Sequence, residues 1–406
     1  MNPCFPSEVH QILAQARREA PIFFCSQLNC WVVTRHEDVL SVLRNPAVFS
    51  SAGTMDPIVQ LPAEVQTVLQ EGYPLVPILF STDPPRHTRL RAILSEAFSP
   101  DRIAAMEPAI RRLAHSLIDG FIREGRADIM KRFAYPLPLY VITDMLRVPR
   151  GDAEMIKSLH NDLLQLWFNP ALPLEQQLDC ARSVVAYQRY YAELVTACRA
   201  SPGDDLLSAM TRARVDGEEP LSTAEVVWHM ILLLSAAHET TQLLITSTLL
   251  QLLEHPAEAS ALEGNPQLLA AAIEETIRLE PPQSMSPRVT TRPVEIGGVS
   301  LPEGACVYVS FASANRDDAA ISRPDERDVH RQRPGNHLGF GAGSHFCLGA
   351  PLARLEGRVA VEAVRERLHN LRVLPGFVPE YSPLVFQRGV KALHLQWDPV
   401  QDQSGS

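Results

Sequence analysis

The chain has 406 residues, a formal net charge of −10 and seven cysteines. Binding to nucleic acid needs a basic surface, so this charge argues against nucleic acid as a partner. The odd number of cysteines, with no Cys-x-x-Cys pair, argues against a disulfide framework or a zinc knuckle and fits a reducing cytoplasm. Residues 1–30 hold no apolar run long enough for a membrane span or a signal peptide, so we expect a cytoplasmic protein without a membrane anchor.

Apolar residues recur at helical spacing along most of the chain, whereas strand patterns are few. We expect helices over 7–20, 36–43, 64–69, 85–98, 106–125, 154–166, 174–200 and 222–254, and strands over 21–24, 30–34, 288–294, 295–299, 306–310 and 391–396. The proline-rich segment 45–80 is expected to line a binding site, because long irregular segments often do so. The inventory predicts a mainly α fold with small β-sheets (α+β), and length alone allows two or three domains.

One predicted helix stands out by its length and by the polar residues at its centre. Ser222-Thr-Ala-Glu225 is a capping box and His255-Pro256 a stop, which predicts a rod of about 48 Å at 1.5 Å per residue. The helix is apolar nearly all round and should be buried. Burying the side chains of Glu239 and Thr240 there therefore costs free energy, unless they have hydrogen-bond partners or serve a function. Thr240 can bond back to a carbonyl of its own helix and Glu239 can meet an arginine, so a purely structural role stays open.

Residues 340–349 read Phe-Gly-Ala-Gly-Ser-His-Phe-Cys-Leu-Gly and run into a second helical segment. The pattern places Cys347 at the mouth of a helix, behind a loop that two glycines allow to fold tightly. The helix dipole and converging N–H groups favour a thiolate there, which suits a metal-centred cofactor. The alternative is an ordinary buried cysteine after a glycine turn.

This stretch closely resembles the haem-binding loop of the cytochrome P-450 family. Six positions of the family pattern are filled at the right spacing, namely Phe340, Gly341, Gly343, His345, Cys347 and Gly349. The resemblance implies haem b (iron protoporphyrin IX) with Cys347 as the axial ligand of its iron. It also implies one large domain over 1–406 with the long central helix crossing over the haem, and a soluble bacterial type, because microsomal members carry an N-terminal anchor. Approximate lobes are a β-rich one over 21–34 and 288–310 plus the C-terminal strands, and a helical one over 85–280 and 350–370.

The centre of the long helix, Ala236-Ala-His-Glu-Thr-Thr241, resembles the oxygen-activation segment of the same family. By this resemblance Glu239 and Thr240 are catalytic, as an acid–alcohol pair that relays protons. The family usually has glycine where this chain has Ala237. The added methyl group predicts a tighter oxygen pocket or a less distorted helix, and therefore altered coupling or an unusual reaction.

Further residues match positions that hold the cofactor or the fold in the family. His87, Arg91, Arg288 and His345 match the contacts to the haem propionates, which need cations or hydrogen-bond donors. Glu275 and Arg278 resemble the structural Glu-x-x-Arg pair. The usual third partner comes from a loop that departs from the family pattern here, as Pro324-Asp-Glu-Arg-Asp328, and leaves Arg327 and Arg331 as alternatives.

The resemblance implies a monooxygenase that inserts one oxygen atom from O2 into a C–H bond or a double bond of an apolar or amphipathic small molecule. We expect electrons from a separate ferredoxin with an NAD(P)H-dependent reductase, because no dinucleotide fingerprint or four-cysteine spacing is present. A basic docking patch is expected from Arg111, Arg112, Arg354 and Arg358. By the same resemblance, the pocket is expected to be lined by parts of 55–80, the region of 163–167, and 232–236, 284–286 and 384–386.

Two other classes of haem protein remain as alternatives. A peroxygenase or an oxidative coupling enzyme does not use the ferredoxin route, but peroxygenase relatives typically lack the pair that Glu239 and Thr240 form. A non-catalytic haem sensor would not need that pair. The monooxygenase is therefore the preferred interpretation.

Overall fold

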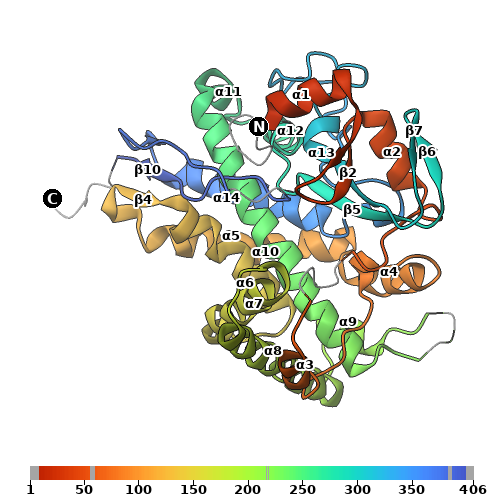
Figure 1. Cartoon of the computed structure of the whole chain (residues 1–406). Helices are drawn as coiled ribbons and strands as arrows, with labels where there is room; N and C mark the ends of the chain where they lie inside the picture. The colour runs from red at the N-terminus through yellow and green to blue at the C-terminus, as the bar shows by residue number, and fades with distance from the viewer. Residues whose placement is uncertain (1–8, 55–59, 216, 218, 383–385, 399–406) are drawn as a thin grey trace. The chain divides into compact units, whose positions relative to one another are not determined.

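The computed structural model describes residues 9–54, 60–215, 217, 219–382 and 386–398 (Figure 1). Helices dominate and the strands form small sheets, which confirms the predicted fold class. The chain separates into two compact units. We call 51–99 with 139–238 the helical unit, and residues up to 50 with 100–138 and 239 onward the mixed unit. Two helices, α6 (Pro136–Met145) and α10 (Thr223–Glu254), contribute residues to both units.

The helical unit is built around two long helices that lie side by side, α7 and α8 (Figure 1). Tyr187 and Tyr191 of α8 are fully buried in this unit, one helical turn apart. Its elements are α3 (Ala63–Leu69), η1 (Leu79–Ser81), α4 (Arg86–Ala97), η4 (Arg150–Asp152), α7 (Ala153–Phe168), α8 (Leu174–Ala200) and α9 (Leu206–Arg212).

The mixed unit holds all strands of the described residues. Its helices and turns are α1 (Val9–Glu19), α2 (His36–Arg44), α5 (Pro100–Asp119), η2 (Ile122–Glu124), η3 (Met130–Ala134), α11 (Pro256–Ala261), α12 (Pro266–Leu279), α13 (Phe311–Ala314), η5 (Gly343–His345) and α14 (Ala350–Arg367). Its strands are β1 (Ile22–Cys25), β2 (Cys30–Val33), β3 (Phe49–Ser50), β4 (Arg126–Asp128), β5 (Met285–Thr290), β6 (Val294–Ile296), β7 (Val299–Leu301), β8 (Cys306–Ser310), β9 (Arg372–Val373) and β10 (His394–Gln396).

The main sheet has the order β1-β2-β8-β5-β3. The predicted hairpin is present, with Cys25 opposite Cys30 in an antiparallel pair. Strand β2 pairs parallel with β8, and β8 pairs antiparallel with β5. Alternate residues Val307 and Val309 of β8 point to one face and are fully buried in a core shared with α2. Smaller sheets join β4-β10-β9 and β6-β7.

The bounds expected for one helix and one strand are wrong, and helix α6 was not expected. The fifth helix begins at Pro100, not 106, because proline is tolerated in a first turn; it then includes Pro108 and ends at Asp119. The strand expected over 295–299 is a hairpin of β6 and β7. Gly297 and Gly298, with φ of 55° and 77°, form its two-residue turn. Helix α6, which includes Pro136 and Pro138, was not among the expected helices.

Within the part of the chain that the structure describes, no helix is long and apolar enough to cross a membrane.

Candidate active site

The loop before α14 brings Cys347 to the start of that helix. Gly341 and Gly343 both have φ of 70°, a conformation that residues with a Cβ rarely adopt. The backbone N–H of Cys347 donates to the carbonyl of Phe340 at 2.9 Å and closes the loop. Gly349 then forms the N-cap of α14, which is 18 residues long. The predicted position of this cysteine at the mouth of a helix is confirmed.

Gly343 also lies against the backbone of α2. A Cβ at Gly343 would be 2.4 Å from the carbonyl oxygen of Leu43, whereas a Cβ at Gly341 would be 3.7 Å from its nearest neighbour, the carbonyl oxygen of His345. We expect Gly343→Ala to lower the unfolding temperature more than Gly341→Ala, because both carry the positive-φ cost of about 1–2 kcal/mol and only the first adds a backbone clash. Thermal unfolding of the two variants measures the difference, and equal midpoints would contradict this packing.

A cation is held beside the cysteine. The guanidinium of Arg354 lies 4.5 Å from the centre of the Phe340 ring and donates to Glu274 at 2.6 and 2.8 Å. The hydrogen bonds to Glu274 raise the pKa of Arg354, and the nearby sulfur of Cys347, when charged, adds to the rise. Burial alone would raise the pKa of Glu274, but hydrogen bonds from Arg354 and His337 hold it at about 2. A fixed positive charge and a helix N-terminus both favour a thiolate at position 347.

The surroundings of Cys347 fit a haem-thiolate site. Its side chain is only half-buried, and the neighbouring Phe346 is 40% exposed. Four of the other described cysteines are buried, at 25, 30, 180 and 198. Burial raises the pKa of the remaining one, Cys306, and keeps it a thiol. An accessible sulfur, a field that favours its anion and an exposed apolar ring occur together at Cys347, as a porphyrin iron ligand requires.

Helix α10 begins as predicted and has accessible residues at its centre as well as at its ends. The Ser222 N–H donates to Glu225 at 2.9 Å, and the Glu225 N–H donates back to the Ser222 hydroxyl at 3.3 Å. Ala236 is exposed and Ala237, Glu239 and Thr240 are half-buried, although most of the helix is buried. In the mixed unit, the amide Nε2 of Gln387 donates to Glu239 Oε2 at 3.0 Å. The structure therefore gives this carboxylate an amide partner, where an arginine was one expectation.

The four residues matched to the propionates lie on three elements. His87, which is buried, and Arg91, which is half-buried, are one turn apart on α4 of the helical unit. Arg288 is buried on β5 of the mixed unit and donates to Ser286 Oγ at 3.1 Å. His345 is half-buried in η5, two residues before Cys347. Their role toward the propionates stays a prediction.

The Glu275–Arg278 pair is a buried, bidentate ion pair. Arg278 donates to the two carboxylate oxygens of Glu275 at 2.7 and 2.8 Å, and both side chains are at most 2% exposed. The guanidinium also donates to the carbonyls of Asn315 and Glu326, each at 2.9 Å. Burial alone would raise the pKa of Glu275, but the hydrogen bonds from its arginines hold it below the usual value.

The structure decides which arginine completes this network. Arg331 Nε donates to Glu275 at 2.9 Å. Arg327 turns instead to Glu258 of α11, with a shortest contact of 2.7 Å. The backbone N–H of Asp328 supplies a further bond to Glu275 at 2.9 Å.

The expected basic docking patch is largely neutralised, so this expectation is wrong for three of its four members. Arg111 and Arg358 share the carboxylates of Glu107 and Glu362, which tie α5 to α14. The hydrogen bonds from Arg358 and Arg111 lower the pKa of Glu107 to about 2, so it stays charged. Arg354 is bound to Glu274, as described above. Arg112 is the exposed member.

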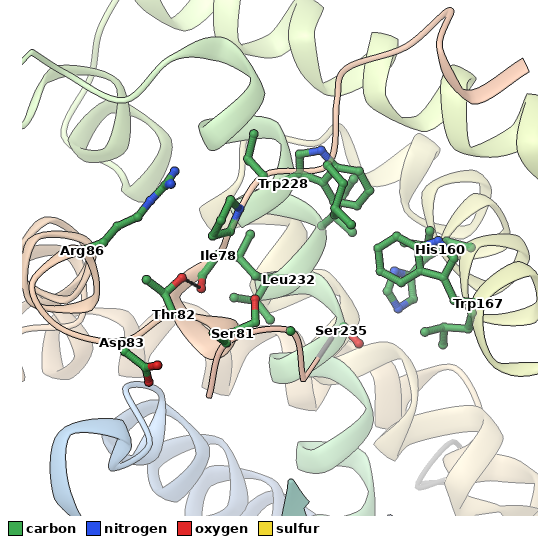
Figure 2. A pocket seen from close by; sticks show the side chains of 18 residues that line it. Ile78, Ser81, Thr82, Asp83, Arg86, His160, Trp167, Trp228, Leu232 and Ser235 are labelled. Atoms are coloured by element: carbon green, nitrogen blue, oxygen red, sulfur yellow. Dashed lines mark hydrogen bonds between the residues drawn. The ribbon is translucent and has the colours of Figure 1, made fainter. Parts of the chain in front are cut away.

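The helical unit contains a cavity of about 440 Å³ (Figure 2). Its lining includes 75–78, Leu163, Leu164, Trp167, Leu232 and Ser235, as predicted. Trp167 and Trp228 stack with ring centres 5.5 Å apart and planes 16° apart. Figure 2 shows these rings and His160 toward one end of the cavity, with Asp83 and Arg86 at the other. The cavity therefore has an aromatic end and a polar end.

Both ionisable groups at the polar end have hydrogen-bond partners. Arg86 pairs with Glu225 at 3.1 Å, and Asp83 accepts a hydrogen bond from the backbone of Ser51 at 2.9 Å. Sequence reasoning missed Arg86, His160 and Trp228 as lining residues. Trp228 lies one turn before Leu232 on α10, so helical periodicity alone would have found it. Of the remaining predicted lining, 284–286 and Phe386 belong to the mixed unit, and 55–59, 384 and 385 lie outside the described residues.

Comparisons with a family model, with known proteins and with solved structures all match cytochrome P450 proteins. The family model described as "Cytochrome P450" matches residues 264–375. The chain is 36% identical to "Cytochrome P450 107B1" of Saccharopolyspora erythraea over 376 residues, which cover 92% of this chain and 90% of that protein. Among solved structures, it is similar to cytochrome P450 CREJ in complex with (4-ethylphenyl) dihydrogen phosphate, with a TM-score of 0.90, 28% identity, and coverage of 98% and 99%. It is also similar to CYP109E1 from Bacillus megaterium in complex with testosterone, with a TM-score of 0.84, 29% identity, and coverage of 98% and 100%.

Proposed function

Because the chain belongs to the cytochrome P450 family, we propose that it is a ferredoxin-dependent haem-thiolate monooxygenase that oxidises a neutral, amphipathic small molecule. The family makes it an oxidoreductase with haem as its cofactor. The observation that carries the proposal in this chain is the position of Cys347, which is half-buried at the mouth of α14 on the loop whose Phe340 ring lies against the guanidinium of Arg354. No other described cysteine has both features.

In this proposal Cys347 holds the iron and the loop around it holds the sulfur. A haem with a thiolate ligand supplies, when bound, the chemistry of O–O cleavage. Arg354 and the N-terminus of α14 stabilise the negative charge of the sulfur. Phe340 presents an apolar ring, and Gly341 and Gly349 allow the tight turn and the start of the helix. His87, Arg91, Arg288 and His345 bind the propionates.

Glu239 and Thr240 form the proton path in this proposal. A half-buried acid at the centre of a mostly apolar helix can exchange protons with water on one side and an alcohol on the other. Glu239 takes up a proton, and Thr240 orients it toward the reaction. Ala237 sets the space beside them, because its methyl group narrows the site relative to glycine.

The electron donor is a separate ferredoxin with an NAD(P)H-dependent reductase. Of the four arginines expected in the docking patch, Arg111, Arg354 and Arg358 are paired with carboxylates and Arg112 is exposed. Docking therefore depends on close-range fit more than on long-range attraction, and we expect its rate to depend weakly on salt.

The substrate class follows from the cavity of the helical unit. The flat faces of Trp167 and Trp228 favour a ring system, which gains about 0.5–1.5 kcal/mol from aromatic packing. At the other end Arg86 is already paired with Glu225, so an anionic group would have to compete with that carboxylate. Hydroxyl or carbonyl groups meet no such competitor. We therefore expect a neutral molecule with a rigid apolar body and polar ends.

Two probes taken from the similar structures test this preference. We expect testosterone, which is neutral, to give the low-spin to high-spin optical shift at lower concentration than (4-ethylphenyl) dihydrogen phosphate, which is anionic. Glu225→Gln keeps the capping box but frees the charge of Arg86, so it should tighten phosphate binding by about twofold to fivefold. Adding Arg86→Gln should remove that gain. A wild-type preference for the phosphate would contradict the proposed substrate class.

A further inference from the structure

The hydrogen bond between Gln387 and Glu239 joins a segment near the C-terminus to the centre of α10. Both residues belong to the mixed unit, and the amide nitrogen lies 3.0 Å from the carboxylate. They are 148 positions apart in the chain. A contact between segments so far apart in the chain forms only if other interactions hold the Gln387 amide in place.

Backbone hydrogen bonds fix the position of Gln387 on both sides. The carbonyl of Phe386 accepts from the Ser284 N–H at 2.8 Å, and the Arg388 N–H donates to the carbonyl of Pro282 at 3.0 Å. Gln283 and Gln387 form an antiparallel bridge between these bonds. The segment around Gln387 is thereby attached to the residues that lead from α12 into β5.

A glycine lets this segment approach α10 closely. A Cβ at Gly389 would be 2.4 Å from Cδ2 of Leu243. Leu243 lies four residues after Glu239, so the two side chains share one face of the helix. Gln387, two residues before Gly389, is therefore held over the same face as the carboxylate.

The partner of Glu239 in this segment is a neutral amide, although a cation is next to it. Arg388 donates to Glu280 and lies 4.5 Å from the centre of the Tyr381 ring. An arginine or lysine favours the ionised carboxylate, since it can donate to the carboxylate but has no acceptor for the O–H of the carboxylic acid. An amide can donate through its NH2 group to a carboxylate and, turned over, accept through its oxygen from a carboxylic acid.

We propose that Gln387 is the positioning residue of Glu239, and that it holds this side chain in both of its protonation states. The inference rests on the proposed role of Glu239 as the residue that takes up protons. An acid that carries protons alternates between carboxylate and carboxylic acid. A partner that can hydrogen-bond to both forms keeps the acid side chain in one position. Gln387 does not touch the reacting atoms and acts through Glu239 alone.

The test compares variants of the haem-loaded enzyme, driven by a purified ferredoxin and its reductase. Gln387→Met keeps the length of the side chain and removes the hydrogen bond, while Gln387→Lys offers a cation. Gln283→Met is the matched control, since Gln283 belongs to the same bridge but its side chain donates to the Met285 carbonyl. Peroxide released per NADPH oxidised is measured with testosterone as the probe and without any probe, because leakage to peroxide needs no substrate.

We expect Gln387→Met to lower the rate of NADPH oxidation by about tenfold, as the loss of a hydrogen bond to a charged group predicts. The peroxide fraction and the solvent deuterium isotope effect should rise, and the half-saturation concentration for the testosterone spin shift should stay unchanged. Gln387→Lys should be slow as well, because it holds Glu239 ionised. Gln283→Met should match the wild type in all of these measurements. If Gln387 had a purely structural role, its replacement would not change the isotope effect.

A Glu239→Gln variant separates the two proposals. If it leaves the peroxide fraction at the wild-type level, the proton path itself is wrong. If it raises that fraction and Gln387→Met does not, only the role of Gln387 is overturned. If Gln387→Lys behaves like the wild type, any donor suffices and the claim about both protonation states fails. The double variant Glu239→Gln, Gln387→Met should be no worse than Glu239→Gln alone, because the two residues act as a unit.

Discussion

Replacing Arg278 by alanine is expected to destabilise the protein by about 3–5 kcal/mol, the cost of leaving a buried charge without its partner. Glu275 is 1% exposed and would keep only Arg331 and one backbone N–H as donors among its described partners. The carbonyls of Asn315 and Glu326 would also lose their bonds to the guanidinium. Chemical denaturation with haem content as a second readout measures the loss.

An ion pair with the same i,i+3 spacing on the protein surface serves as the control for the buried Glu275–Arg278 pair. Asp179 and Arg182 are also an i,i+3 pair, but their side chains are 69% and 62% exposed. Arg182→Ala should therefore change the free energy of unfolding by less than about 1 kcal/mol. Equal losses in the two variants would contradict the conclusion that burial makes the Glu275–Arg278 pair important. Arg278→Lys should lie between them, because it keeps the charge and loses the fork of hydrogen bonds.

Cys347→Ser is expected to abolish turnover and to remove the far-red-shifted Soret band of the ferrous carbon monoxide complex. A serine hydroxyl does not ionise at neutral pH, so Arg354 and the N-terminus of α14 would have no anion to stabilise. The loop itself should survive, because its closing bond uses the backbone N–H of residue 347. We expect the unfolding midpoint of the protein without haem to change little.

Cys306→Ser is the control for this substitution. Cys306 is also half-buried, but it lies on β8 and burial raises its pKa. The variant should keep the red-shifted band. If Cys347→Ser kept that band as well, another residue would be the ligand.

Features that depend on neighbouring residues could be predicted from the sequence. The capping box of α10 and the glycine turns before Cys347 are local, and the structure has both. The hairpin of β6 and β7 was missed although its signal, Gly297-Gly298, is also local. A pair of adjacent glycines between two short apolar runs predicts such a turn.

Features that depend on distant partners could not be predicted. Arg358 meets Glu107, 251 positions away, and this contact turns an expected basic patch into a neutral one. The choice between Arg327 and Arg331 depends on the path of a loop, which directs Arg331 to Glu275 and Arg327 to Glu258. The amide of Gln387 meets Glu239 only because Gly389 allows close approach to α10. The charge pattern of the sequence predicts none of these pairings.

The carbon monoxide difference spectrum of the reduced wild-type protein tests the central claim most directly. Ligation of the haem iron by the sulfur of Cys347 predicts the far-red-shifted Soret band of a thiolate complex. A spectrum of the histidine-ligated type would contradict it.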